Sequence, residues 1–174
     1  MAMCRSALRT KGMGNPSPSQ VLSQVNRVIH PDMREDMFIA MDYGVLNIRT
    51  LEFSFCRAGH EPLIAHRNNP RRIEILAPRG MALGIDSGTV FDAALQEQHF
   101  TLQKGDILIF YTDGITEALD ESGQEFDRDQ LIEAIESCVD QDAQAMAKNI
   151  EERVRRFIGK RPQNDDITLM IVRI

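Results

Sequence analysis

Apolar residues at helical spacing mark the first part of the chain. Residues 1–9 are good helix formers with no N-cap before them, which is typical of the interior of a helix. After a short loop, Ser17 has the position of an N-cap, with Pro18 as the first helical residue and Gln20 closing a capping box. The apolar stripe that follows ends before Pro31 and consists of Val21, Leu22, Val25, Val28 and Ile29. The pattern predicts two helices at the start of the chain.

A run of short strands comes next. Residues 51–55 alternate between apolar and polar side chains, as a half-buried strand does. Five consecutive apolar residues at 107–111 follow a turn at 104–106 and predict a central strand covered on both faces. The other predicted strands are residues 37–41 continuing through 43–46, 63–65, 73–76 and 98–102.

The last part of the chain returns to helices and ends in a strand. Asp127 and Asp142 have N-cap positions before helical stripes, and residues 167–174 form a mostly apolar closing strand. Strands come first and helices later, without the regular alternation of a Rossmann-type sheet. These patterns predict an α+β fold with antiparallel sheet.

The composition is that of a globular protein of one domain. The chain has 174 residues, 43% of them hydrophobic and 26% charged, and no apolar run reaches the length of a membrane span. The formal net charge of -6 argues against a nucleic-acid partner and favours a cytoplasmic protein. Cys4, Cys56 and Cys138 form no CxxC pair, so neither a disulfide framework nor a zinc site is indicated.

Acidic residues lie at the ends of two apolar strands. Asp113 follows the strand at 107–111, and Asp165 and Asp166 precede the closing strand. If the two strands are neighbours with matching ends, these carboxylates converge and form an oxygen-rich site for Mg²⁺ or Mn²⁺. Gly114 permits an unusual backbone angle and close approach beside Asp113. An ordinary Asp-Gly turn and a solvated acidic loop explain the same residues equally well.

Five segments in the same order resemble one protein family. Residues 105–118 (GDILIFYTDGITEA) resemble the core motif of the bacterial SpoIIE/RsbU-type branch of the PPM, or protein phosphatase 2C-like, phosphatases. The other four segments are residues 37–40 (MFIA), 57–62 (RAGHEP), 80–84 (GMALG) and 164–169 (NDDITL). One such match is weak, but five in order are specific.

The resemblance implies an αββα sandwich of two antiparallel sheets flanked by helices. It also implies a two-metal site, holding Mn²⁺ or Mg²⁺, that activates water for in-line attack on phosphorus. By position, Asp113 corresponds to a catalytic metal ligand, and Asp165 matches the last ligand better than its neighbour Asp166 does. Gly114 and Thr112 support the motif.

His60 lies in the Ala-Gly-His-x-Pro turn that the family shares. It can orient a catalytic group or lie near substrate, but a histidine in such a turn more often hydrogen-bonds the backbone, and we expect that structural role.

The function that the resemblance implies is removal of phosphate from serine or threonine of a bacterial signalling protein. An anti-sigma-factor antagonist in a stress response is such a substrate, and a sensor or receiver domain is expected upstream. The alternative is a non-catalytic pseudophosphatase that binds a signalling protein.

The chain departs from the family in lacking an Asp-x-x-Gly-His-Gly stretch, which normally supplies the aspartate that bridges the two metals. We therefore expect residues 1–174 to be a single phosphatase domain without its first strands and first metal motif. Such a chain should bind metal weakly, have low activity and expose apolar surface or exchange strands, for instance in a homodimer.

Overall fold

A computed structural model of the protein describes residues 2–174, which divide into two compact units. The first unit comprises the residues up to Pro62 together with Ala77–Leu102. The second comprises Leu63–Leu76 and Gln103–Ile174.

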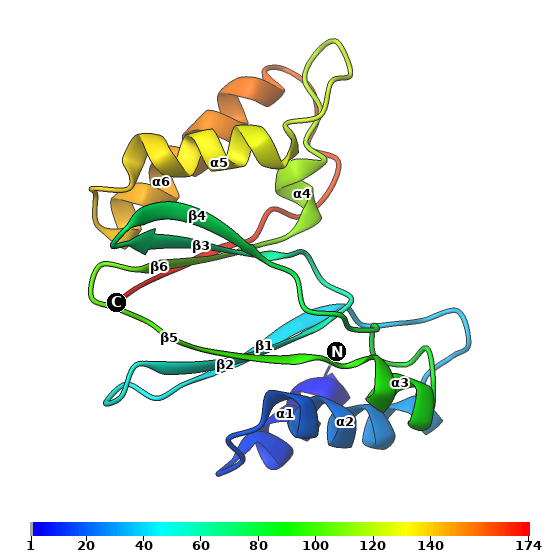
Figure 1. Cartoon of the computed structure of the whole chain (residues 1–174). Coiled ribbons are helices and arrows are strands. Elements are labelled where there is room, and N and C mark those ends of the chain that lie inside the picture. Colours follow the sequence, from blue (N-terminus) through cyan, green and yellow to red (C-terminus); the bar gives the residue numbers. More distant parts are fainter. Residues whose placement is uncertain (1) are drawn as a thin grey trace. The chain divides into compact units, whose positions relative to one another are not determined.

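The first unit is a three-stranded antiparallel sheet with helices along one face. Figure 1 shows α1 and α2 running beside this sheet, and α2 contacts both β1 and β2. The strands, in the order β1-β2-β5, are β1 (Met41–Leu46), β2 (Glu52–Ala58) and β5 (Glu97–Thr101). The helices are α1 (Ala2–Gly12), α2 (Pro18–Ile29), the short 3-10 helix η1 (His30–Asp32) and α3 (Thr89–Ala94).

The start of α2 is fixed by polar contacts at its N-terminus. The Ser17 hydroxyl accepts a hydrogen bond from the Gln20 N–H, which is the predicted N-cap interaction. The Glu97 carboxylate on β5 accepts from the Ser17 hydroxyl over 2.7 Å and from the Ser19 N–H over 2.9 Å. Farther along α2, four residues of the predicted apolar stripe are fully buried (Val21, Leu22, Val25 and Ile29), whereas Val28 is 43% exposed.

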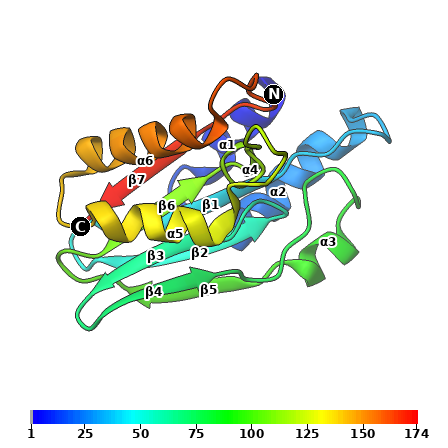
Figure 2. The ribbon, with the colours of Figure 1, turned by 90° about the horizontal axis from the view of Figure 1, so that it is seen from above.

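The second unit is a four-stranded antiparallel sheet with the last two long helices on one face. Figure 2 shows α5 and α6 lying over the strands of this sheet. The strands, in the order β4-β3-β6-β7, are β3 (Leu63–Asn68), β4 (Arg71–Leu76), β6 (Ile107–Tyr111) and β7 (Leu169–Arg173). The helices are α4 (Asp113–Thr116), α5 (Asp127–Cys138) and α6 (Ala143–Ile158).

Strand β6 is the centre of the second unit. Ile107, Leu108 and Ile109 are all at most 1% exposed, so both faces of the strand are covered, as its unbroken apolar run predicts. Its neighbour β7 is antiparallel, and Tyr111 pairs with Leu169 at one end of the ladder. This register places the turn after β6 beside the segment before β7.

The predicted α+β class, with two antiparallel sheets and flanking helices, is confirmed. The strand predicted from residue 37 begins only at Met41, because Ile39 pairs with Leu83 through an isolated bridge while Met37 and Phe38 are exposed. Helices α3 and α4 are too short to show a helical stripe, and the sequence did not predict them. Within residues 2–174, no helix is both long and apolar enough to cross a membrane.

Candidate functional site

The turn after β6 is tied to the segment before β7 by Thr112. Its N–H donates to the Thr168 carbonyl over 3.1 Å, next to the pairing of Tyr111 with Leu169. Its hydroxyl donates to the Asp166 carbonyl over 3.0 Å and accepts from the Thr168 N–H over 2.9 Å. Backbone and side chain of Thr112 therefore both hold the two segments together.

Gly114 brings the same two segments into closest approach. It is buried in α4, and a Cβ atom on it would lie 2.5 Å from the Asp166 carbonyl oxygen and 3.0 Å from the carbonyl carbon. Both distances are shorter than side chains tolerate against backbone, so only glycine fits here. The close approach expected at Gly114 is thus present, and it serves the contact with Asp166.

The three predicted acidic residues lie on these adjoining turns, and all three are exposed. The Gly114 N–H donates to Asp113 Oδ1 over 2.9 Å, and the Asp166 N–H donates to Asp165 Oδ1 over 2.7 Å. The residues from 2 to 174 contain no group of three or more His, Cys, Asp or Glu side chains that could hold a metal ion. The adjacency of the strand ends is as the sequence predicts, while the ligand roles of Asp113, Asp165 and Asp166 stay predictions.

Asp165 lines a cavity of about 180 Å³ next to the acidic turns. Two further acids, Glu117 and Glu125, line the same cavity together with Gly114. Asp113 and Asp166 are not among the lining residues. Asp113, Asp165 and Asp166 therefore do not all line this cavity.

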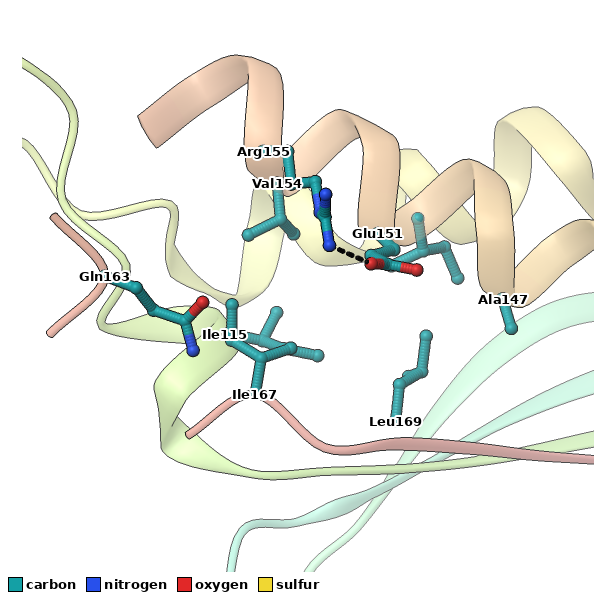
Figure 3. Close-up of a pocket in the computed structure, with 9 residues that line it drawn as sticks. Ile115, Ala147, Glu151, Val154, Arg155, Gln163, Ile167 and Leu169 are labelled. Atoms are coloured by element: carbon teal, nitrogen blue, oxygen red, sulfur yellow. Dashed lines mark ion pairs between the residues drawn. The ribbon is translucent and has the colours of Figure 1, made fainter. Parts of the chain in front are cut away.

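A larger cavity of about 370 Å³ lies between α6 and the residues that follow the two acidic turns (Figure 3). Ile115 and Ile167, which follow the two turns in sequence, form part of its apolar lining with Leu169. Its polar contribution is mainly the ion pair between Glu151 and Arg155 on α6, at 2.8 Å. With its one cation already paired, this cavity lacks the converging donors that a phosphate group needs.

A buried carboxylate in the first unit was not anticipated from the sequence. Asp42 lies on β1 with its side chain 8% exposed, and its Oδ2 atom is 3.2 Å from His60 Nδ1. Its Oδ1 atom is buried without a hydrogen-bond partner among the described residues. Burial raises the pKa of Asp42, against the lowering effect of His60 and Arg57. An acid inside a strand segment that is otherwise mostly apolar is the sequence signal that could have revealed it.

The expected hydrogen bond from the His60 side chain to the backbone stays a prediction. The His60 ring contacts the Asp42 carboxylate, whereas its carbonyl oxygen is the group that bonds, accepting from Arg57 Nη1 over 2.7 Å.

A family model described as Stage II sporulation protein E (SpoIIE) matches residues 1–174. The chain belongs to the SpoIIE family. Its sequence is 32% identical over 173 residues to phosphoserine phosphatase RsbU of Bacillus subtilis (strain 168), covering 99% of this chain and 50% of RsbU. The chain thus spans about half the length of that relative.

Solved structures share the fold of this SpoIIE-family chain. The SiaA-PP2C domain of Pseudomonas aeruginosa matches with a TM-score of 0.81 at 20% identity, over 99% of this chain and 68% of that domain. The phosphatase domain of the cell fate determinant SpoIIE from Bacillus subtilis, presoaked with Mn, matches with a TM-score of 0.63 at 17% identity, over 98% and 73% of the two chains. These matches show a PP2C-type fold, and the predicted PPM-type family is confirmed.

Proposed function

We propose that this chain is the phosphatase region of a protein that hydrolyses phosphoserine or phosphothreonine on a bacterial signalling protein. The observation that carries the proposal is the contact between Gly114 and the Asp166 carbonyl, which sets the Asp113 turn against the Asp165–Asp166 turn. Glycine at this position lets the two acid-bearing turns approach more closely than any larger residue would. Membership of the SpoIIE family and the resemblance to phosphoserine phosphatase RsbU support a phosphatase reaction.

We infer that Asp113 and Asp165 are ligands of Mg²⁺ or Mn²⁺, with Asp166 as the rival of Asp165. The donor chemistry fits, because Mg²⁺ binds through one or two carboxylates and keeps several waters. All three carboxylates are exposed, so they need not be stripped of water before a hydrated ion arrives. When bound, a divalent cation offsets charge on phosphoryl oxygens and acidifies water for attack on phosphorus.

The chain's own part in this scheme is to fix the distance between the acids. Thr112 joins the two turns through three hydrogen bonds, and Gly114 removes the side chain that would separate them. This preorganisation lets two carboxylates from segments about 50 residues apart act on one ion.

A second candidate is a non-catalytic module that binds a phosphorylated signalling protein, and the lack of an Asp-x-x-Gly-His-Gly stretch in residues 1–174 supports it. An anti-sigma-factor antagonist is the partner class for either candidate.

Hydrolysis of p-nitrophenyl phosphate and of a phosphoserine protein, with Mn²⁺ or Mg²⁺ titrated, tests the proposal. The variants are Asp113→Asn and Asp165→Asn, with Asp129→Asn, an exposed acid on α5, as the matched control. Mn²⁺ binding is measured in parallel by electron paramagnetic resonance. Metal-dependent hydrolysis that both site variants lose and the control keeps supports the phosphatase. A folded chain that binds the phosphoprotein and hydrolyses neither substrate with any metal supports the binding module.

A further inference from the structure

Large apolar side chains adjoin a cavity that lies wholly in the first unit, just after α2. The cavity has a volume of about 300 Å³ and is lined by residues of the segment 30–38, which loops out between α2 and β1 (Figure 1), and by Gly84 and Ile85. Three of its lining residues, Met37, Phe38 and Ile85, are 53%, 64% and 58% exposed. We call these three residues and the cavity that they adjoin the Phe38 patch. Single exposed apolar residues are ordinary, but several around one cavity are typical of a binding surface.

Hydrogen bonds within the first unit fix the backbone of both walls of the Phe38 patch. Ile39 and Leu83 exchange two backbone hydrogen bonds of 2.9 Å, which join the two wall segments. The fully buried Asn26 side chain of α2 accepts from the Gly84 N–H and donates to the Asp86 carbonyl, each over 2.8 Å. The exposed apolar side chains therefore project from an ordered backbone. A partner that covers them does not have to order the backbone first, which favours binding.

Acidic residues outnumber basic ones at the rim of the Phe38 patch. The segment 30–38 has three acids, Asp32, Glu35 and Asp36, and one arginine, Arg34, so its formal charge is -2 with histidine neutral. The arginine is paired with Asp36 at 2.7 Å. Asp32 and Glu35 are exposed, and neither forms an ion pair with another residue of the described chain. Two carboxylates at the rim are thus available to cations from outside.

This charge determines which occupant the Phe38 patch fits. A second copy of the chain, docked through the same patch, would bring two acidic rims together, and the whole chain already has a formal charge of -6. Nucleic acids and anionic membranes are repelled for the same reason. A polypeptide that offers an apolar side chain with lysine or arginine beside it complements both the cavity and its rim.

We propose that the Phe38 patch is a docking surface for a protein partner that presents an apolar anchor flanked by lysine or arginine. The anchor enters the cavity against Phe38 and Ile85, and the flanking cations pair with Asp32 and Glu35. The proposal goes beyond the proposed phosphatase function and does not depend on it, because every residue that carries it lies in the first unit.

A random library of peptides about twelve residues long tests the proposal. Peptides are selected on the immobilised chain without added metal and counter-selected on Phe38→Ala. The selected peptides should share an apolar residue with lysine or arginine close to it. Fluorescence anisotropy then gives the Kd of one labelled selected peptide for each variant.

We expect Phe38→Ala to raise this Kd by about 10-fold or more. Val90→Ala is the matched control, since Val90 is 57% exposed in the same unit and does not line the cavity, and it should change the Kd by less than about 2-fold. Glu35→Lys should raise the Kd by about 10-fold at low salt and by less at about 0.5 M salt, because screening weakens the interaction between exposed charges. Asp129→Lys, at an exposed acid of the second unit, is its control and should have little effect.

Circular dichroism establishes that each variant is folded, and sedimentation velocity reports self-association. The proposal is overturned if the selected peptides are acidic, if none depends on Phe38, or if Phe38→Ala and Glu35→Lys bind as tightly as the wild type. A dimer that Phe38→Ala dissociates, without any selected peptide, would assign the patch to a second copy and overturn the proposed partner. None of these measurements uses a phosphorylated substrate, so their outcome is independent of whether the chain is a phosphatase.

Discussion

Replacement of Gly114 by alanine tests whether the contact between the two acidic turns is the basis of the site. Alanine is normally the better helix former, by about 1 kcal/mol, so propensity alone predicts that Gly114→Ala stabilises the chain. The structure predicts the opposite sign. The new Cβ would lie 2.5 Å from the Asp166 carbonyl oxygen, against 3.4 Å for the start of ordinary contact. The Cβ atom would thus lie 0.9 Å (3.4 minus 2.5) closer than ordinary contact allows, and the atom that it meets belongs to the backbone, so no side chain can rotate away to relieve the clash.

Relief of this clash moves the Asp165–Asp166 turn away from α4. The movement stretches the hydrogen bonds that Thr112 makes to Asp166 and Thr168, now 3.0 and 2.9 Å long. Overpacking of this kind costs about 1–3 kcal/mol, which exceeds the gain from propensity. A displacement near 1 Å between catalytic groups can lower a rate by about 100-fold, so metal-dependent hydrolysis should fall by a similar factor.

Urea unfolding and phosphatase rates of Gly114→Ala are compared with those of Arg128→Ala, an exposed residue in the first turn of α5. The control change should alter the free energy of unfolding by less than about 0.5 kcal/mol. A Gly114→Ala chain that is as stable as the wild type, and equally active, would refute the reasoning from the close contact.

Four further predictions concern titratable groups. Asp113→Asn should abolish metal-dependent hydrolysis while leaving the urea midpoint within error of the wild type, because the side chain is exposed. Asp106→Asn should cost about 3 kcal/mol in urea unfolding, because it breaks a buried ion pair with Arg67 at 3.0 Å. Burial lowers the pKa of His66, so the unfolded chain binds a proton at this residue more readily than the folded chain does. The free energy of unfolding should therefore fall as the pH drops below 6.5, and His66→Phe should remove this dependence. Burial raises the pKa of Asp42, so the protonated carboxyl is favoured in the folded chain. The free energy of unfolding is therefore not reduced by Asp42 below pH 3.8, and it falls as the pH rises through the folded-state pKa. Asp42→Asn should accordingly have a higher urea midpoint than the wild type at pH 7 but not at pH 3.5.

Local patterns predict those elements whose own residues carry the signal. Ser17 and Asp142 accept the N-cap hydrogen bonds expected of them, and the apolar run at 107–111 is the buried central strand. The prediction that Asp113 converges with Asp165 and Asp166 assumed that their strands are neighbours, and β6 does pair with β7; the convergence of the carboxylates themselves stays a prediction.

Long-range contacts were not predictable in the same way. The pairing of Asp42 with His60 depends on the register of β1 against β2, and a shift by one residue would turn the carboxylate to the other face. Gly114 is recognisable in sequence only as part of an Asp-Gly turn, while its purpose depends on a carbonyl 52 positions later, at Asp166. Such features come from tertiary structure, and single-sequence periodicity carries no information on them.

The two groups of acidic residues differ in what they cost the folded chain. Asp113, Asp165 and Asp166 are exposed, so the chain can retain them at little energetic cost whether or not they bind a metal. Asp42 is buried with one oxygen unpaired, and a chain that needed only a stable β1 would have an apolar residue there. The two groups should therefore respond differently to substitution, because only Asp42 imposes a cost of burial on the folded chain. It follows that Asp42→Asn should change the stability of the chain, whereas Asp113→Asn should change its activity alone.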